Sequence, residues 1–88
     1  MLHPVTTTRF EKDYVRQHKR GKELSKLKEI MARIVRDAAL PPSHRDHLLT
    51  GNWSKYRECH VEPDWLLIYR IDGESVVFER TGTHADLF

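Results

Sequence analysis

The fold is indicated by WLLIYRIDGESVVFERT, the stretch that runs from residue 65 to residue 81. Residues 65–71 are apolar nearly throughout, which is typical of a central strand covered on both faces. Asp72-Gly73 is a signal for a two-residue hairpin, and residues 75–81 then supply a second β-prone run. The sequence therefore predicts an antiparallel hairpin at the centre of a sheet.

A third strand is predicted just before this hairpin. The pattern alternates from residue 55 to residue 61. It sends two sets of side chains to opposite faces, with Tyr56, Glu58 and His60 on one and Arg57, Cys59 and Val61 on the other. Glu62-Pro63-Asp64 makes the turn into the central strand, and residues 43–52 read as a polar loop. We expect a three-stranded antiparallel meander.

Two helices are predicted ahead of the meander. Thr8-Arg9-Phe10-Glu11 matches a capping box, so a helix begins near Arg9 and continues until Gly21 permits a break. The second helix carries one apolar stripe with spacings of three and four, formed by Leu24, Leu27, Met31, Ile34 and Ala38. Pro41-Pro42 ends it, because proline cannot continue a helix.

The order of these elements defines the fold class. Val5-Thr6-Thr7 is a short β-prone segment, and Thr83 is suited to cap a final helical turn that brings His84, Leu87 and Phe88 back onto the sheet. We predict an α+β fold of order β-α-α-β-β-β with a short C-terminal turn. Its two N-terminal helices should pack on one face of a twisted, mainly antiparallel sheet.

Length and composition limit the possible classes of protein. The 88 residues predict one domain, residues 1–88, and 39% hydrophobic with 32% charged residues is the composition of a folded protein. No apolar run approaches the ~20 residues that cross a bilayer, and the N-terminus has no signal-peptide core, so we expect a cytoplasmic protein that does not bind membranes. Cys59 is the only cysteine, which excludes an internal disulfide.

Positive charge is concentrated in the first half of the chain. Residues 1–50 contain 11 Lys and Arg against 6 Asp and Glu, a net +5, whereas residues 51–88 contain 4 against 7, a net −3. A basic surface of this kind suits a polyanion such as nucleic acid, or an acidic protein partner. An ordinary solvated helix face is the commoner explanation of such residues.

Histidines supply candidate groups for proton transfer. Four of the six follow the helices, namely His44, His47, His60 and His84. In an antiparallel meander the end of the first strand, the start of the second and the end of the third lie at one end of the sheet. His60, Asp64, Arg80 and His84 occupy these positions and can therefore converge. His47 joins them only if its loop folds back.

Arg80 leaves two interpretations open. A guanidinium in the otherwise apolar third strand is costly unless it faces an anion. That anion is either a phosphate or one of the nearby carboxylates, of which the candidates are Glu58, Glu62 and Glu79. A metal centre is disfavoured, because the sequence has no His-Glu-x-x-His helix and no Cys pair, so we expect neither a metal ion nor another cofactor.

Aromatic residues also allow two interpretations. Bases could stack on Trp53, Tyr56, Trp65 and Phe88. Large aromatic residues are mostly buried, so a core position is favoured for the two tryptophans, while Phe88 is evenly balanced between the two roles.

Three segments resemble the YafQ branch of the RelE-like toxins of bacterial toxin-antitoxin modules. They are DHLLTGNW at residues 46–53, YRECHVEPDWLLIY at residues 56–69 and ERTGTHADLF at residues 79–88. The resemblance implies a RelE-like fold and an endoribonuclease that cuts translated messenger RNA in the A site of the 70S ribosome. It also implies a small antitoxin that neutralises the toxin, with a monomeric free toxin and a hetero-oligomer in the complex.

The resemblance places the family's active-site residues at His47, His60, Asp64, Arg80 and His84, and its substrate-binding residues at Trp65 and Phe88. The implied chemistry is metal-free attack by the ribose 2′-hydroxyl on the adjacent phosphorus. We assign His84 as the acid, Asp64 with His60 or His47 as the base, and Arg80 to the phosphate. Contacts to 16S ribosomal RNA are expected from Lys22, Lys26, Lys28, Arg33 and Arg36.

Two rival functions fit the same residues. In the first, the protein is a non-catalytic module that binds RNA or the ribosome and blocks translation, and Arg80 and His84 only hold phosphate. In the second, it is a metal-dependent hydrolase, whose activity a chelator would abolish.

Overall fold

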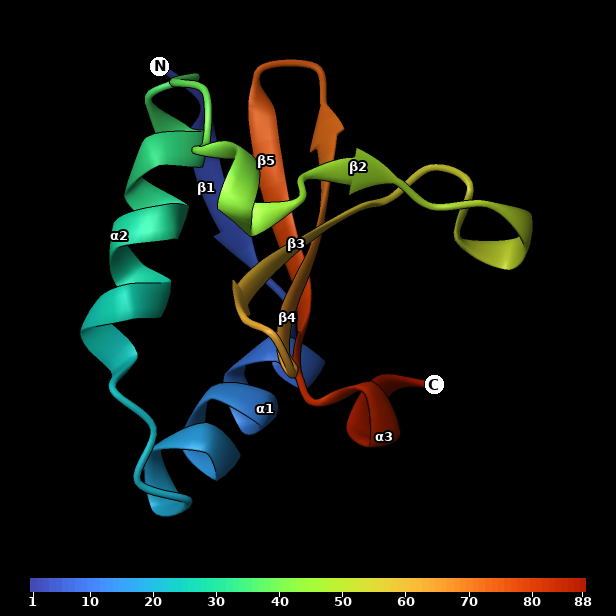
Figure 1. Ribbon diagram of the computed structural model, residues 1–88. Coiled ribbons are helices and arrows are strands. Elements are labelled where there is room, and N and C mark those ends of the chain that lie inside the picture. The colour runs from blue at the N-terminus through green and yellow to red at the C-terminus, as the bar shows by residue number, and fades with distance from the viewer.

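The computed structural model describes residues 1–88, which form a five-stranded mixed sheet with three helices (Figure 1). The elements in chain order are β1 His3–Thr6, α1 Thr8–Lys19, α2 Leu24–Val35, β2 His47–Leu48, β3 Arg57–Glu62, β4 Trp65–Asp72, β5 Ser75–Gly82 and α3 His84–Leu87. The strands lie in the order β1-β5-β4-β3-β2, with β1 parallel to β5 and all other pairs antiparallel. The predicted α+β class is confirmed.

The central hairpin of β4 and β5 forms as predicted. Residues 65–69 of β4 are all buried, because α1 and α2 cover one face and the residues around Trp53 and Leu87 cover the other. The turn differs by one residue from the prediction, since Asp72 pairs with Ser75 and the loop residues are Gly73 and Glu74. Gly73 has a φ of 59°, a left-handed conformation that glycine adopts without strain.

Both long helices cover the same face of the sheet, with α1 against β5 and α2 against β3. The main core lies between them and combines helix residues such as Phe10, Leu27 and Ile30 with strand residues such as Trp65 and Phe78. None of the helices has both the length and the apolar character needed to cross a membrane.

The helix boundaries differ from those predicted. Thr7, not Thr8, is the N-cap of α1, and its hydroxyl accepts the amide hydrogen of Phe10 at 3.0 Å. Glu11 instead accepts a hydrogen bond from Thr6. α2 ends at Val35, well before the prolines, because the chain enters a left-handed turn at Asp37.

The predicted loop from residue 43 to residue 52 contains a short strand. β2 pairs with β3 so that His47 lies opposite Glu58, and short 3₁₀ turns precede and follow it. The segment after β2 folds over the face of the sheet that the long helices leave open. Together with α3 it forms a second, smaller core around Leu66, Ile68 and Leu87.

Candidate active site

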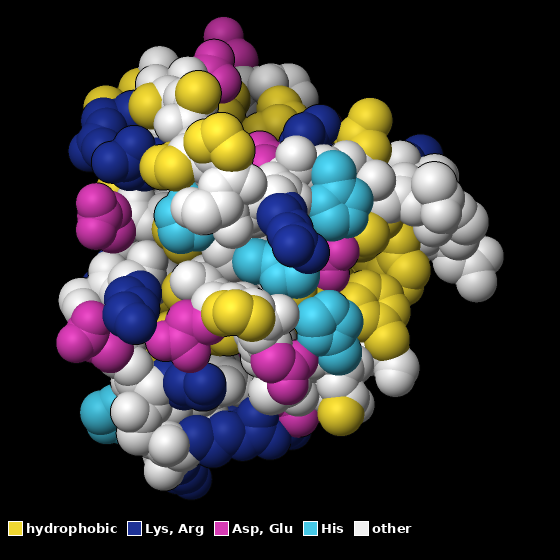
Figure 2. All heavy atoms as spheres, in the orientation of Figure 1, with side chains coloured by type: hydrophobic (Ala, Val, Ile, Leu, Met, Phe, Trp, Pro, Cys, Tyr) yellow, Lys and Arg dark blue, Asp and Glu magenta, His cyan; other side chains and the backbone are white.

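The histidines of the predicted site lie on the face of the sheet opposite α1 and α2, whereas Trp65 points into the main core. His60 alternates with Cys59 and Val61, whose side chains belong to the main core, so its own side chain points to the open face. Figure 2 shows histidine side chains gathered on this face, with carboxylates and a basic side chain among them. The face is therefore polar at one end and apolar over the smaller core.

The strand register brings the site residues together. His60 on β3 lies opposite Leu66 on β4, which lies opposite Gly82 on β5. The next row joins Glu58, Ile68 and Arg80. Residues from the end of β3 and the end of β5 thus meet across β4, as the direction of the strands predicted.

Asp64 and His84 form the most direct contact in the site. Asp64 Oδ1 accepts hydrogen bonds from the His84 backbone N–H at 2.9 Å and from Nδ1 of its ring at 2.6 Å. The backbone hydrogen bond first, and then the ring, hold the pKa of Asp64 below its usual range. Because Nδ1 donates to a carboxylate, Nε2 is the nitrogen of His84 left for other chemistry.

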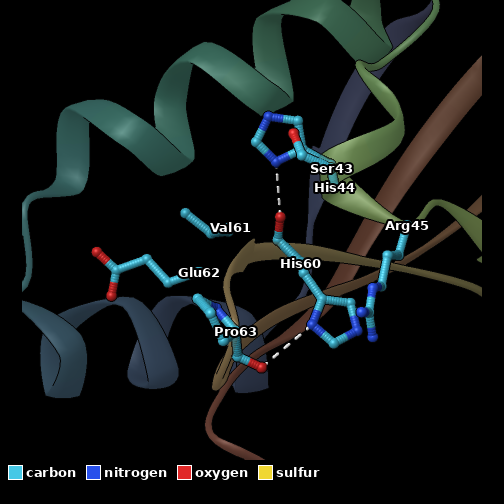
Figure 3. A pocket seen from close by; sticks show the side chains of 7 residues that line it. All are labelled: Ser43, His44, Arg45, His60, Val61, Glu62 and Pro63. Carbon is cyan, nitrogen blue, oxygen red and sulfur yellow. Dashed lines mark hydrogen bonds between the residues drawn. The ribbon is translucent and has the colours of Figure 1, made fainter.

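His60 completes a pair of imidazoles. Its ring centroid lies 5.8 Å from that of His84, and its Nδ1 donates to the carbonyl of Pro63 at 3.2 Å (Figure 3). Both rings are therefore oriented through Nδ1 and keep Nε2 without a hydrogen bond in the protein. Two such rings can contact the same phosphodiester from different sides.

His47 joins the site because its loop folds back as β2. Its Nε2 lies 3.1 Å from Oε2 of Glu58, and its Nδ1 donates to the carbonyl of Arg45 at 2.6 Å. The buried Glu58 is a site residue that was expected from sequence only as a partner of Arg80. The strand alternation, which placed Glu58 on the same face as His60, was the available signal.

Arg80 is held by a carboxylate that was not among the expected partners. The candidates Glu58, Glu62 and Glu79 are wrong, because Asp13 of α1 accepts from Nε at 2.6 Å and from Nη2 at 3.2 Å. This hydrogen bonding to Asp13 raises the pKa of Arg80. Asp13 also accepts the backbone N–H of Thr81 at 3.2 Å. Nη1 of Arg80 has no hydrogen-bond partner in the protein.

The two predicted substrate-binding aromatics have opposite environments. Trp65 has no exposed surface and donates from Nε1 to the hydroxyl of Thr81 at 3.0 Å. The ring lies in the main core, as favoured for a large aromatic residue, and a contact between Trp65 and substrate stays a prediction. Phe88 is 60% exposed, and its ring meets that of Trp53 edge to face with centroids 5.9 Å apart.

The five basic residues predicted on the helices are not equivalent, and Lys22 and Arg36 lie just outside α2. Lys22 and Lys26 bind the two oxygens of Glu62 at 3.1 and 3.0 Å. These hydrogen bonds lower the pKa of Glu62. Arg33 lies 3.8 Å from Glu29, while Lys28 and Arg36 make no ion pair. Lys28 and Arg36 are therefore the cations of this set that stay free for a polyanion.

The helical turn that carries His84 is fixed to α1. Asp86 accepts two hydrogen bonds from Arg20, at 2.6 and 3.0 Å, and forms a capping box with Thr83. The hydrogen bond from Arg20 is the main reason that the pKa of Asp86 is lowered. Gly82 is required beside this turn, since a Cβ there would lie 2.8 Å from the Asp86 carboxylate.

Three of the site residues could also hold a metal ion. Ligand atoms of Glu58, His60 and His84 all lie within 4.8 Å of one another. Two imidazoles and a carboxylate are a donor set that suits zinc or copper. Sequence spacing gave no sign of this cluster, because its members come from two separate elements.

Comparison with known proteins gives one family over the whole chain. A family described as bacterial toxin of type II toxin-antitoxin system, YafQ, matches residues 2–88. The mRNA interferase toxin YafQ of Escherichia coli K12 is 46% identical over 80 residues, which cover 90% of this chain and 87% of that protein.

Solved structures give the same result. YafQ in the E. coli DinJ-YafQ complex superposes with a TM-score of 0.93 and 42% identity, covering 100% of this chain and 99% of that one. A copper-bound mutant toxin from Helicobacter pylori has a TM-score of 0.96 and 33% identity, with complete coverage of both chains. A metal-bound toxin from the same organism has a TM-score of 0.94 and 34% identity, again with complete coverage.

Proposed function

We propose that this chain, which belongs to the YafQ family of toxins of bacterial type II toxin-antitoxin systems, is an mRNA interferase that cuts messenger RNA on the ribosome. Its sequence motifs had indicated the same family. The E. coli relative with 46% identity is named an mRNA interferase toxin. The observation that carries the proposal is the pair of oriented imidazoles, His60 and His84, on an open face. The proposed place of action is the cytoplasm, where messenger RNA is translated.

The proposed reaction uses the RNA's own 2′-hydroxyl as nucleophile and needs no metal ion. The 2′-oxygen bonds to the adjacent phosphorus while the bond from phosphorus to the 5′-oxygen of the next nucleotide breaks. The products are a 2′,3′-cyclic phosphate and a 5′-hydroxyl. One proton leaves the 2′-hydroxyl and one reaches the 5′-oxygen, so the enzyme must supply a base and an acid.

His84 is the acid in this mechanism and Asp64 supports it. The Asp64 carboxylate orients the ring through Nδ1 and stabilises its protonated form, so that Nε2 delivers the proton to the leaving oxygen. Asp64 therefore acts through His84 and not as a separate base.

His60 is the base. Its Nδ1 donates to a backbone carbonyl, so in the neutral ring Nε2 carries the lone pair that accepts the 2′-hydroxyl proton. His47 is less suited to this task, because oxygens of Arg45 and Glu58 engage both of its nitrogens. We assign His47 and Glu58 to positioning the strand around His60.

Arg80 stabilises the charge that develops on the phosphate oxygens. Asp13 binds Nε and Nη2 and leaves Nη1 to contact the phosphorane, which carries more negative charge than the substrate. Phe88, exposed beside the imidazoles, stacks on or positions a base. Lys28 and Arg36 lead the contacts to ribosomal RNA, since they have no competing ion pair.

The proposed protein partner is an antitoxin encoded with the toxin. The E. coli relative was solved in complex with DinJ, its antitoxin. An acidic antitoxin segment would suit the basic first half of this chain. We propose that the free protein is a monomer and that the complex is a hetero-oligomer.

Metal ions should inhibit this reaction. The H. pylori neighbours are described as copper-bound and metal-bound. An ion held by Glu58, His60 and His84 would occupy the nitrogens that proton transfer needs. We expect cleavage on programmed ribosomes, with Mg²⁺ kept at the level that the ribosome needs, to continue when a chelator selective for transition metals is present and to fall when Cu²⁺ is added. A hydrolase that depends on a zinc or copper ion would instead lose its activity with that chelator.

The test of the proposed function is His84→Ala assayed with programmed ribosomes. We expect ribosome binding to persist and cleavage to fall on the order of 100-fold or more, because the proton donor is lost. His18→Ala, an exposed histidine change on α1, is the matched control and should cleave like the wild type. Cleavage by His84→Ala at the wild-type rate would refute the proposal. Translation inhibited without any cleavage would favour the non-catalytic module.

A further inference from the structure

A cavity of about 370 Å³ opens beside the imidazole of His60, within the size range of small-ligand sites (Figure 3). Seven residues line it and only one of them is hydrophobic. His60 forms part of its wall, so whatever occupies the cavity lies next to the proposed base. The loop from Ser43 to Arg45 forms the opposite wall.

This loop is fixed in a strained conformation at Arg45. The residue has a φ of 49°, a left-handed conformation that is costly for a residue with a side chain. Backbone hydrogen bonds from His44 and Arg45 to Pro41 and Pro42 hold it, together with the bond from the His44 ring to the His60 carbonyl at 2.7 Å. The Arg45 carbonyl in turn accepts from His47. The backbone of residues 43–45 is thus held in place beside His60 and His47.

The Arg45 side chain is the free cation of the cavity. It makes neither a hydrogen bond nor an ion pair, and Figure 3 shows it extending toward the His60 ring. The acidic residue of the cavity wall, Glu62, already binds Lys22 and Lys26 and points away from this space. Arg80 differs from Arg45 in this respect, because Asp13 binds two of its three guanidinium nitrogens. An anion in the cavity would therefore meet Arg45.

We propose that this cavity binds a phosphodiester of the single-stranded messenger next to the cleaved linkage, with Arg45 as the phosphate ligand. The inference rests on the proposed function, because the shared His60 places the cavity one step along the RNA from the reacting phosphorus. A guanidinium suits this task, since its planar fork holds two phosphate oxygens at once. The left-handed backbone at Arg45 then serves to direct its guanidinium into the cavity.

The experiment measures binding of a single-stranded oligoribonucleotide with 2′-O-methyl riboses, which the enzyme cannot cleave, over a range of salt concentrations. We expect Arg45→Asn and Arg45→Ala to bind about tenfold more weakly at low salt. The slope of log K against log salt should fall by about 0.7 for the loss of one phosphate contact. Arg45→Lys should keep most of the slope. Arg70→Ala, at the opposite end of the sheet, is the control and should bind like the wild type.

The variants separate binding from folding. Asparagine tolerates the left-handed conformation, so Arg45→Asn should unfold at a temperature no lower than the wild type. Wild-type affinity and slope for Arg45→Asn would overturn the assignment. The assignment would also be overturned if Arg45→Asn lost affinity only for vacant ribosomes, which would indicate ribosomal RNA as the occupant. A loss of affinity only for polyglutamate would indicate an acidic protein. His84→Ala cleaving normally would defeat the proposed function instead, whatever the result for Arg45.

Discussion

Two pairs hold the end of β5, a carboxylate with an arginine and a carboxylate with a histidine, and they differ in burial. Asp13 contacts Arg80 at 2.6 Å with the two side chains 5% and 14% exposed. Asp64 contacts His84 at the same distance with the side chains 65% and 55% exposed. The buried pair fixes a permanent charge in one place, whereas the exposed pair orients a ring that can still exchange protons with substrate and water. Geometry alone therefore does not separate a structural contact from a catalytic one.

The buried pair should give the largest effect, and the effect should be on stability. Asp13→Asn should lower the free energy of unfolding by about 3 kcal/mol, because it leaves a guanidinium of low exposure without its counter-charge. Urea unfolding measures this change. Combining Asp13→Asn with Arg80→Gln should cost less than the sum of the single changes. Additive losses would show that the pair is not coupled.

The exposed pair should respond in activity instead. Asp64→Asn should slow cleavage on programmed ribosomes about 10- to 100-fold, because the protonated ring of His84 loses its stabilising charge. Its unfolding midpoint in urea should match that of the wild type, since exposed pairs contribute little to stability. A large drop in stability with unchanged cleavage would reverse the roles given to the two pairs.

A third carboxylate, Asp86, should make the stability of the protein depend on pH. Its pKa is lowered in the folded state, mainly by Arg20, so the unfolded chain binds the proton more readily. The stabilisation is therefore present above the ordinary Asp range and is lost as pH falls below about 4. Asp86→Asn should lower the Tm by a few degrees at pH 7 and by progressively less in acid. Thermal unfolding over a pH series tests this, and a difference independent of pH would contradict it.

The smallest effect is expected at Phe88. Phe88→Ala should reduce cleavage a few-fold by removing a stacking surface, with Tm unchanged because the ring is mostly exposed. Phe88→Trp should retain activity. Full activity of the alanine variant would remove Phe88 from the site.

Much of the fold followed from the sequence because its signals are local. The apolar run of β4 and the strand directions around it predicted that His60, Asp64 and His84 would meet, and they do. β2 was missed because a strand of two residues, His47–Leu48, has no periodicity to detect. Its position depends on pairing with β3, which is a tertiary contact.

The features that the sequence could not predict involve residues far apart in the chain. Asp13 and Arg80 are separated by 67 positions, and no spacing rule connects a helix residue to a strand at that distance. Trp65 begins a strand that is buried on both faces, so alternation could not indicate which core it enters. Its placement beside the substrate came from the family resemblance alone.

The parallel pairing of β1 with β5 has a consequence for how the toxin acquires its activity. It joins segments such as Thr7 and Glu79 that are 72 positions apart, and such contacts form slowly because a long loop must close first. The local β3-β4-β5 meander can form before the N-terminal segment docks on its edge. Because α1 brings Asp13 and Arg20 with that segment, a newly made chain would lack the contacts that fix Arg80 and the turn of His84 until this last stage of folding.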